Sequence, residues 1–173
     1  METMELANDI PIPEPPACEE DVHRLSSPVD EVRYGSLGGF TLTASENAVV
    51  PGNPMTFRLE NTTEAGRVTG NKRKHDIQRR VDGEWRSIYW VKSEMYNALG
   101  VHQPPGNGFQ WTFTVSRDGL EQSRQSNTSY SVCDAIVPGD YRFVYWGVSR
   151  HEERESDYET EYAVGARFTV VRS

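Results

Sequence analysis

The sequence predicts an all-β protein built as a two-sheet β-sandwich of about seven antiparallel strands. Its structural signals are short runs in which apolar and polar residues alternate, and turn residues separate these runs. Seven such runs fall within the last three quarters of the 173-residue chain, and no stretch has a convincing helical period. Short strands at this spacing favour a sandwich over a closed barrel, although the barrel stays open as the alternative.

The first four expected strands lie between residues 40 and 90, and the first of them alternates cleanly between apolar and polar residues. They cover residues 40–44, 55–59, 75–81 and 85–90. In the second, Met55, Phe57 and Leu59 face the core while the intervening residues face water. The third and fourth are joined by the sequence Val-Asp-Gly-Glu at residues 81–84, which is typical of a tight hairpin turn.

Three more strands follow two expected loops. The loops are residues 91–108, which contain a Pro-Pro-Gly sequence, and the polar residues 116–135. The strands are residues 109–115, 141–148 and 163–171. The first of them places Phe109, Trp111 and Phe113 on one face, and is the clearest half-buried strand in the chain.

A structural corner is expected just before the second of these strands. Pro138 and Gly139 supply the backbone angles of a type II turn, and Tyr141 follows directly after Asp140. This arrangement resembles the tyrosine corner of immunoglobulin-like sandwiches, in which the phenol bonds back across the turn. The strand that follows is bulky on both faces, so we expect it to lie in the middle of a sheet.

The chain divides into an extended segment, residues 1–35, and one sandwich domain, residues 36–173. The first segment is rich in proline and acidic residues and lacks apolar periodicity, which is the composition of a linker. Only residues 29–34 alternate weakly and could add to a sheet edge. No run is long and apolar enough to insert into a membrane, and no signal peptide is visible.

The charge composition disfavours a nucleic-acid partner. The formal net charge is −8, and the basic residues are 15 arginines and only three lysines. An acid excess with scarce lysine is what a chain kept soluble in high salt would show, and an ordinary acidic protein is the alternative. The one basic cluster, residues 72–80, would divide its charges between two strand faces, so it does not predict a phosphate-binding patch.

Cys18 and Cys133 are the only cysteines. Their even number and their wide separation favour a disulfide in an oxidising compartment, with two unrelated buried thiols as the alternative. Such a bridge would close a loop of more than a hundred residues, for which the loop-entropy model gives about 4–5 kcal/mol of stabilisation.

Several of these motifs, taken in order, resemble the immunoglobulin-like domains of secreted and surface proteins of bacteria and archaea. They are Asn61 after a strand, Asp-Gly-Glu-Trp at 82–85, Gln-Pro-Pro-Gly at 103–106 and Val-Pro-Gly-Asp-Tyr-Arg-Phe at 137–143. The likeness covers roughly residues 38–172 and is similar to versions from salt-adapted archaea. The resemblance implies a non-catalytic module at the cell exterior. Phe143 stands where antibody domains have a cysteine, so their inter-sheet disulfide is not available.

Three further patterns are candidate binding or modification sites. Asn61 and Asn127 each begin an Asn-x-Thr/Ser sequence in a polar loop and are candidate N-glycosylation sites. Residues 151–161 carry six carboxylates, but the stretch lacks the spacing of a calcium loop, so a solvated acidic hairpin is favoured over a calcium site. The four tryptophans could line a carbohydrate-binding face, but such residues more often belong to a core.

No catalytic arrangement is visible, because the chain lacks a nucleophile elbow, a phosphate loop and a metalloprotease helix, and its four histidines are scattered. We therefore expect no cofactor and no enzymatic activity. The leading expectation is an extracellular module that acts through protein contacts, with copies of itself among its partners. The alternatives are a filament subunit that adds an N-terminal strand to its neighbour's sheet, and a carbohydrate-binding or adhesion module with exposed aromatic residues.

Overall fold

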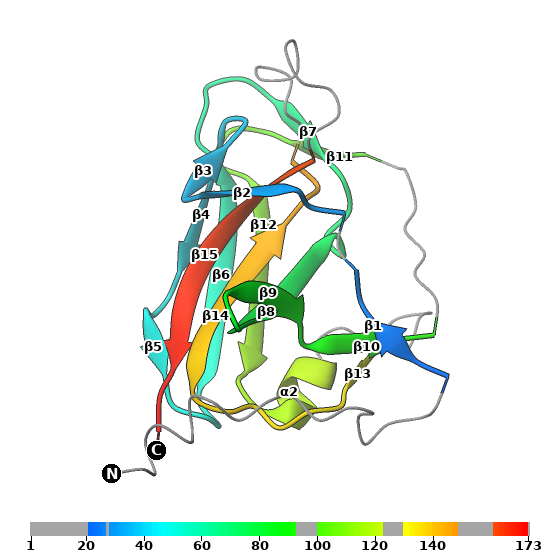
Figure 1. The fold of residues 1–173 in the computed structure, drawn as a ribbon. Coiled ribbons are helices and arrows are strands. Elements are labelled where there is room, and N and C mark those ends of the chain that lie inside the picture. The colour runs from blue at the N-terminus through cyan, green and yellow to red at the C-terminus, as the bar shows by residue number, and fades with distance from the viewer. Residues whose placement is uncertain (1–20, 27, 93–99, 123–129, 149–160, 173) are drawn as a thin grey trace.

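The computed structural model describes residues 21–26, 28–92, 100–122, 130–148 and 161–172. Within these ranges the chain forms fifteen strands and a single short helix (Figure 1). The expected all-β class is confirmed. The expected number of about seven strands is too low, because short strands also form in segments that the sequence pattern left as loops or linker.

One main sheet has four strands and is built around β6. Its order is β12 (Gly108–Thr114), β6 (Pro54–Asn61), β4 (Phe40–Ala44) and β3 (Ser36–Leu37). All of its neighbouring strands run antiparallel. The apolar residues of β6 are fully buried at every second position, as the alternation predicts, while its intervening residues lie on the outer face.

The other main sheet has six strands. Its order is β2 (Glu31–Tyr34), β15 (Tyr162–Val170), β14 (Gly139–Tyr145), β8 (His75–Val81) and β9 (Glu84–Ser87), and β5 (Ala48–Val49) also pairs with β15. The central position expected for β14 is confirmed, since it lies between β15 and β8. Both β2 and β5 run parallel to β15, which the expectation of a purely antiparallel fold did not include.

The two main sheets pack face to face through aromatic side chains. Phe57 of β6 stacks on Phe143 of β14, with ring centroids 4.5 Å apart and planes inclined by 10°. Trp111 of β12 contacts the same Phe143 ring at 4.8 Å, and Phe57 also contacts Phe168 of β15 at 5.6 Å. Burying an aromatic side chain of this size contributes about 2–3 kcal/mol. This core fixes which side chains of each sheet must point outward.

Three segments differ from the sequence prediction. The strand expected at 85–90 is two strands, because the chain leaves the six-stranded sheet after β9 and joins a three-stranded sheet as β10. The two expected loops contain β11, β13 and α2, although no helix was expected, and β7 lies between the second and third expected strands. The bounds are β1 (His23–Arg24), β7 (Arg67–Thr69), β10 (Tyr89–Val91), β11 (Val101–Gln103), β13 (Tyr130–Val132) and α2 (Arg117–Gln122).

Part of the expected linker segment takes part in these sheets. β1 pairs with β10. Residues 29–34 were expected to add to a sheet edge, and β2, which lies within them, pairs with β15 at one edge of the six-stranded sheet. Among the described residues, no helix combines the length and the apolar character that crossing a membrane requires.

Candidate interaction surface

The outer face of the six-stranded sheet carries a group of arginines around one tryptophan. On β14, Tyr141, Phe143 and Tyr145 are buried against the other sheet. Strand alternation therefore turns Arg142 to the outer face. Arg167 of β15 and Arg80 of β8 lie on the same outer face and are exposed.

The strand register brings these side chains together. Arg142 lies directly opposite Arg167 on one side and opposite Gln78 on the other. The hairpin between β8 and β9 places Trp85 directly opposite Arg80. Its turn residues Asp82 and Gly83 both have positive φ, 52° and 81°, the conformation of the tight hairpin turn that was predicted there.

The indole ring of Trp85 is the centre of the group. The guanidinium carbon of Arg142 lies 4.5 Å from the ring centroid, that of Arg167 lies at 5.3 Å, and that of Arg80 lies at 5.7 Å. All three distances fall within the range in which a cation is attracted to an aromatic face. We call this surface the arginine–tryptophan face, defined by Trp85 and these three arginines together with Tyr34 and Gln78.

Arg142 is held in place by two hydrogen bonds besides its contact with the ring. Its Nε donates to Gln78 Oε1 at 2.6 Å, and its Nη1 donates to the hydroxyl of Tyr34 at 2.9 Å. Tyr34 is 47% exposed and reaches over the sheet from β2. A Cβ atom at Gly165 would lie only 2.6 Å from Val32 Cγ1, so this glycine leaves room for β2 to pack beside β15.

Gln78 is itself positioned by a buried polar network. Its Nε2 donates to Asp76 Oδ2 at 3.2 Å, and Asp76 Oδ1 accepts a hydrogen bond from Ser87 Oγ at 2.6 Å. Asp76 is fully buried and Gln78 is nearly so. Hydrogen bonds inside a protein are stronger than in water, so this network restrains Gln78 and, through it, Arg142.

The arginine–tryptophan face carries three arginines, and the exposed carboxylate of Asp140 lies on the same outer face two residues before Arg142. No ion pair joins Arg80, Arg142 or Arg167 to a carboxylate within the ranges that the structure describes. Arg33 and Arg86 of the same sheet differ, because they pair with Glu31 at 3.3 Å and with Glu84 at 4.0 Å.

This concentration of charge is unfavourable for the isolated sheet. Like charges on directly opposed strand positions destabilise a sheet, so the Arg142–Arg167 pair costs up to about 1 kcal/mol. In a chain of net charge −8, such a patch is the reverse of the average surface. The arrangement can bind a group that supplies negative charge, because guanidinium groups donate charge-assisted hydrogen bonds to carboxylates.

The predicted structural corner lies at the start of β14. The Tyr141 hydroxyl donates to the main-chain oxygen of Val137 at 2.7 Å. Gly139 has a φ of 151°, which L side chains rarely adopt. Burial raises the pKa of Tyr141 to about 12, while Arg79 and the hydrogen bond to Val137 act in the opposite direction. Burial also raises the pKa of Tyr145 well above its ordinary value.

The candidate glycosylation site at Asn61 has a structural role. Asn61 is 1% exposed, and its Nδ2 donates to the main-chain oxygens of Ala65 and Gln103, both at 2.9 Å. Its Oδ1 accepts from the main-chain nitrogen and the hydroxyl of Thr63. An amide held in this way has no room for a glycan in the folded chain. The other candidate, Asn127, lies outside the described residues.

Of the two cysteines predicted to form a disulfide, only Cys133 is among the described residues. Cys133 is disulfide-bonded and buried. Its expected partner, Cys18, lies outside the described residues, so this pairing stays a prediction.

The four tryptophans do not form one stripe. Trp111 is buried between the two main sheets and donates to the main-chain oxygen of Lys72 at 3.1 Å. Trp90 is buried on β10, with the Arg24 guanidinium 4.4 Å from its ring centroid, and Trp146 is half-buried just after β14. Only Trp85 belongs to the arginine–tryptophan face.

Neither charged cluster of the sequence, the basic residues 72–80 or the acidic residues 151–161, forms one surface among the described residues. Of the basic residues 72–80, only Arg80 reaches the arginine–tryptophan face, while Arg79 is buried beneath the sheet. Residues 151–160 of the acidic stretch lie outside the described residues, so the weak possibility of a calcium site there is not tested. In the part of the chain that the structure describes, no three His, Cys, Asp or Glu side chains are grouped so that they could hold a metal ion.

Sequence reasoning missed this surface because its members are far apart along the chain. Tyr34 and Arg167 are separated by most of the domain, and they meet only through the strand order β2–β15–β14–β8–β9. One signal was available. The alternation of β14 placed Arg142 on the face opposite to the aromatic core, on a strand expected to be central.

Comparison with known proteins gives no family. No protein-family model matches the chain, and no curated protein matches it. Among solved structures, the chain is similar to a β-glucosidase from Erythrobacter marinus at 15% sequence identity and a TM-score of 0.37. That alignment covers 77% of this chain and 15% of the glucosidase. A likeness this weak carries no conclusion about fold or activity.

Proposed function

We propose that this chain is a non-catalytic, immunoglobulin-like module that acts outside the cell by binding another protein through its arginine–tryptophan face. The observation that carries the proposal is the grouping of Arg80, Arg142 and Arg167 around Trp85 without a carboxylate partner among the described residues.

The strand order supports the immunoglobulin-like assignment. The order β4–β6–β12 corresponds to strands A, B and E of that fold, and β9–β8–β14–β15 corresponds to strands C′, C, F and G. β4 pairs with β6, while β5, which follows it, pairs with β15 of the other sheet, so the first strand is shared between the two sheets. The hydrogen bond from Tyr141 to Val137 matches the tyrosine corner before strand F.

The proposed location outside the cell has one supporting observation. Disulfides persist in oxidising compartments and are rare in the cytosol. Cys133 is disulfide-bonded. The location was expected from the resemblance to surface proteins, and the state of this cysteine agrees with it.

The chemistry of the face favours a partner segment rich in carboxylates. Arg167 and Arg80 are exposed, and Arg142 is held by Gln78 and Tyr34, so part of the ordering is complete before binding. Tyrosine, tryptophan and arginine are the residues most enriched in the energetically important parts of protein interfaces. An acidic segment would relieve the repulsion between Arg142 and Arg167 as it binds.

Isothermal titration calorimetry with an oligoglutamate peptide tests this proposal. We expect the wild type to bind the peptide, with an affinity that falls as the salt concentration rises. The double variant Arg142→Gln/Arg167→Gln should bind about 30-fold more weakly, since two charge-assisted contacts are lost. Arg58→Gln, which removes an arginine from the outer face of the other sheet, is the matched control and should bind like the wild type.

Two results would overturn the proposal. One is equal affinity of the wild type and the double variant for the peptide, with both chains folded by circular dichroism. The other is that dextran sulfate binds the arginine–tryptophan face while oligoglutamate does not, which would point to a polysaccharide as the partner.

A further inference from the structure

The free edge of β12 differs from the two end strands of the six-stranded sheet, β2 and β9. An edge strand presents unpaired N–H and C=O groups to any other strand, and proteins usually guard such edges with charged residues, proline or bulges. The edge strands β2 and β9 each carry one glutamate and one arginine within four residues. β12 has seven residues, and none of them is charged or a proline.

The hydrogen bonds at both ends of β12 show which residues face the free edge. Asn61 N donates to Asn107 O at 2.7 Å, and Val115 N donates to Asn53 O at 2.9 Å. The odd-numbered positions therefore turn their main-chain groups toward β6. Alternation along the ladder then turns the main-chain groups of Gln110 and Thr112 toward the free edge.

The middle of this edge is open. Gln110 and Thr112 are exposed. No main-chain hydrogen bond reaches residues 108–113 from a described residue outside β6. The end of the strand is different, because a Cβ atom on Gly119 of α2 would collide with the main-chain oxygen of Thr114. The helix therefore covers the last position, and its residues Gly119 and Gln122 border a recess that Thr112 and Thr114 also line.

We infer that β12 pairs in antiparallel fashion with β12 of a second copy of this chain, which joins the two four-stranded sheets into one. The strand complements itself, because antiparallel pairing about a two-fold axis sets uncharged residues opposite uncharged residues. Pairs of threonines and pairs of aromatic residues on opposing strands are favourable. Such a contact closes on itself as a dimer and uses a part of the molecule separate from the arginine–tryptophan face.

The two surfaces respond to salt in opposite directions. Each copy carries a net charge of −8, so two copies repel one another over long range. Salt screens this repulsion, and the β12 pair itself contains no ion pair that salt could weaken. Dimerisation therefore strengthens as salt rises, whereas binding of an acidic peptide to the arginine–tryptophan face weakens.

Sedimentation equilibrium of the full chain at low and high sodium chloride tests the inference. The expected result for the wild type is a monomer–dimer equilibrium that shifts toward dimer at high salt. Thr112→Lys should raise the dissociation constant about tenfold or more, because it sets two like charges close together across the paired edge. Thr43→Lys adds the same charge to an exposed threonine on the outer face of the same sheet and should leave the equilibrium unchanged.

A second variant separates loss of pairing from loss of folding. Thr112→Pro removes a main-chain N–H that β6 does not use, so the chain should stay folded by circular dichroism while dimerisation falls. The inference is overturned if the wild type is monomeric at every salt concentration, or if Thr43→Lys weakens the dimer as much as Thr112→Lys. It is also overturned if Arg142→Gln/Arg167→Gln abolishes the dimer, since that would place the contact on the other sheet.

Discussion

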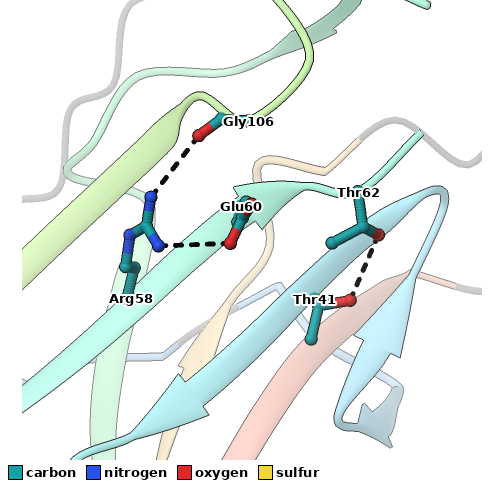
Figure 2. A network of polar contacts seen from close by, with 5 residues as sticks. All are labelled: Thr41, Arg58, Glu60, Thr62 and Gly106. Carbon is teal, nitrogen blue, oxygen red and sulfur yellow. Dashed lines mark hydrogen bonds and ion pairs between the residues drawn. The ribbon is translucent and has the colours of Figure 1, made fainter. Parts of the chain in front are cut away.

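The outer faces of the two main sheets differ in how their polar side chains are paired. On the four-stranded sheet, Arg58 Nη1 forms an ion pair with Glu60 Oε1 at 3.1 Å, and Arg58 Nη2 donates to the main-chain oxygen of Gly106 at 3.4 Å (Figure 2). The hydroxyls of Thr41 and Thr62 lie 3.2 Å apart on the same face (Figure 2). On this face, the Arg58 charge and the hydroxyls of Thr41 and Thr62 therefore have partners within the same chain.

The arginine–tryptophan face of the six-stranded sheet leaves its three arginines without a direct ion pair to a described carboxylate. Its three outward arginines contact Trp85, and Arg142 also contacts two neutral side chains, Gln78 and Tyr34. Two sheets of one small domain thus show two uses of arginine. A guanidinium paired with a carboxylate covers a sheet, and a guanidinium held against an aromatic ring stays available to another molecule.

The largest expected effect concerns the buried side-chain amide of Asn61, at the end of β6 in the four-stranded sheet. Asn61→Ala should lower the free energy of unfolding by about 3 kcal/mol, because it removes a buried amide that bonds to main-chain groups of Thr63, Ala65 and Gln103. Urea denaturation measures the change. Thr62→Ala, next to it in sequence but exposed, should cost less than about 1 kcal/mol. A loss for Asn61→Ala as small as that of Thr62→Ala would remove the structural role given to this amide.

The six-stranded sheet should lose stability at alkaline pH through Tyr141. The folded chain holds the phenol proton more tightly than the unfolded chain does, since its pKa is about 12 rather than 10.0. This contribution is complete below pH 10 and is lost as the pH rises toward 12, by about 2–3 kcal/mol in total. Tyr145 acts in the same direction.

Thermal melts as a function of pH check this expectation. The melting temperature should fall steeply above pH 10, and Tyr141→Phe should make that fall shallower while lowering the melting temperature at neutral pH. An equally steep fall in Tyr141→Phe would assign the alkaline transition to other groups.

Arg167→Gln tests whether the open charges serve binding rather than folding. Its affinity for oligoglutamate should fall about fivefold to tenfold, or about 1 kcal/mol. Its free energy of unfolding should stay unchanged or rise by a few tenths of a kcal/mol, because the substitution removes the repulsion with Arg142. Loss of stability with unchanged affinity would make this arginine a structural residue like Arg58.

The smallest effect is expected at Arg58 itself. Exposed ion pairs contribute about 0–1 kcal/mol, so Arg58→Gln should change the free energy of unfolding by about 0.5 kcal/mol or less. Chemical denaturation at low salt is the measurement. A loss of peptide affinity in this variant would erase the distinction between the two faces.

The fold was predictable where local pattern decides it. The apolar residues of β6 and β14 alternate with a period of two, and these strands lie in the middle of the two main sheets. The hairpin at Asp82 and Gly83 was readable because few residues other than glycine, asparagine and aspartate adopt positive φ. These features depend on neighbouring residues alone.

The errors arose where distant segments decide the structure. The run 85–90 reads as one strand, but Ile88 N bonds to Ile77 O and the chain then crosses to β1 and β13. The helix α2 was missed because its six residues bury only Leu120, too few for a helical period to be visible. The arginine–tryptophan face was missed because its residues lie on strands far apart in the sequence, and the order of strands in a sheet cannot be read from alternation.

The central claim is that Arg142 and Arg167 receive a carboxylate-bearing partner while Arg58 does not. Nuclear magnetic resonance of the arginine Nε–Hε groups during titration with oligoglutamate tests it within one molecule. We expect the signals of Arg142 and Arg167 to shift in a saturating manner and that of Arg58 to stay in place. Equal small shifts of all three signals, without saturation, would contradict the claim and leave the face as an ordinary sheet surface.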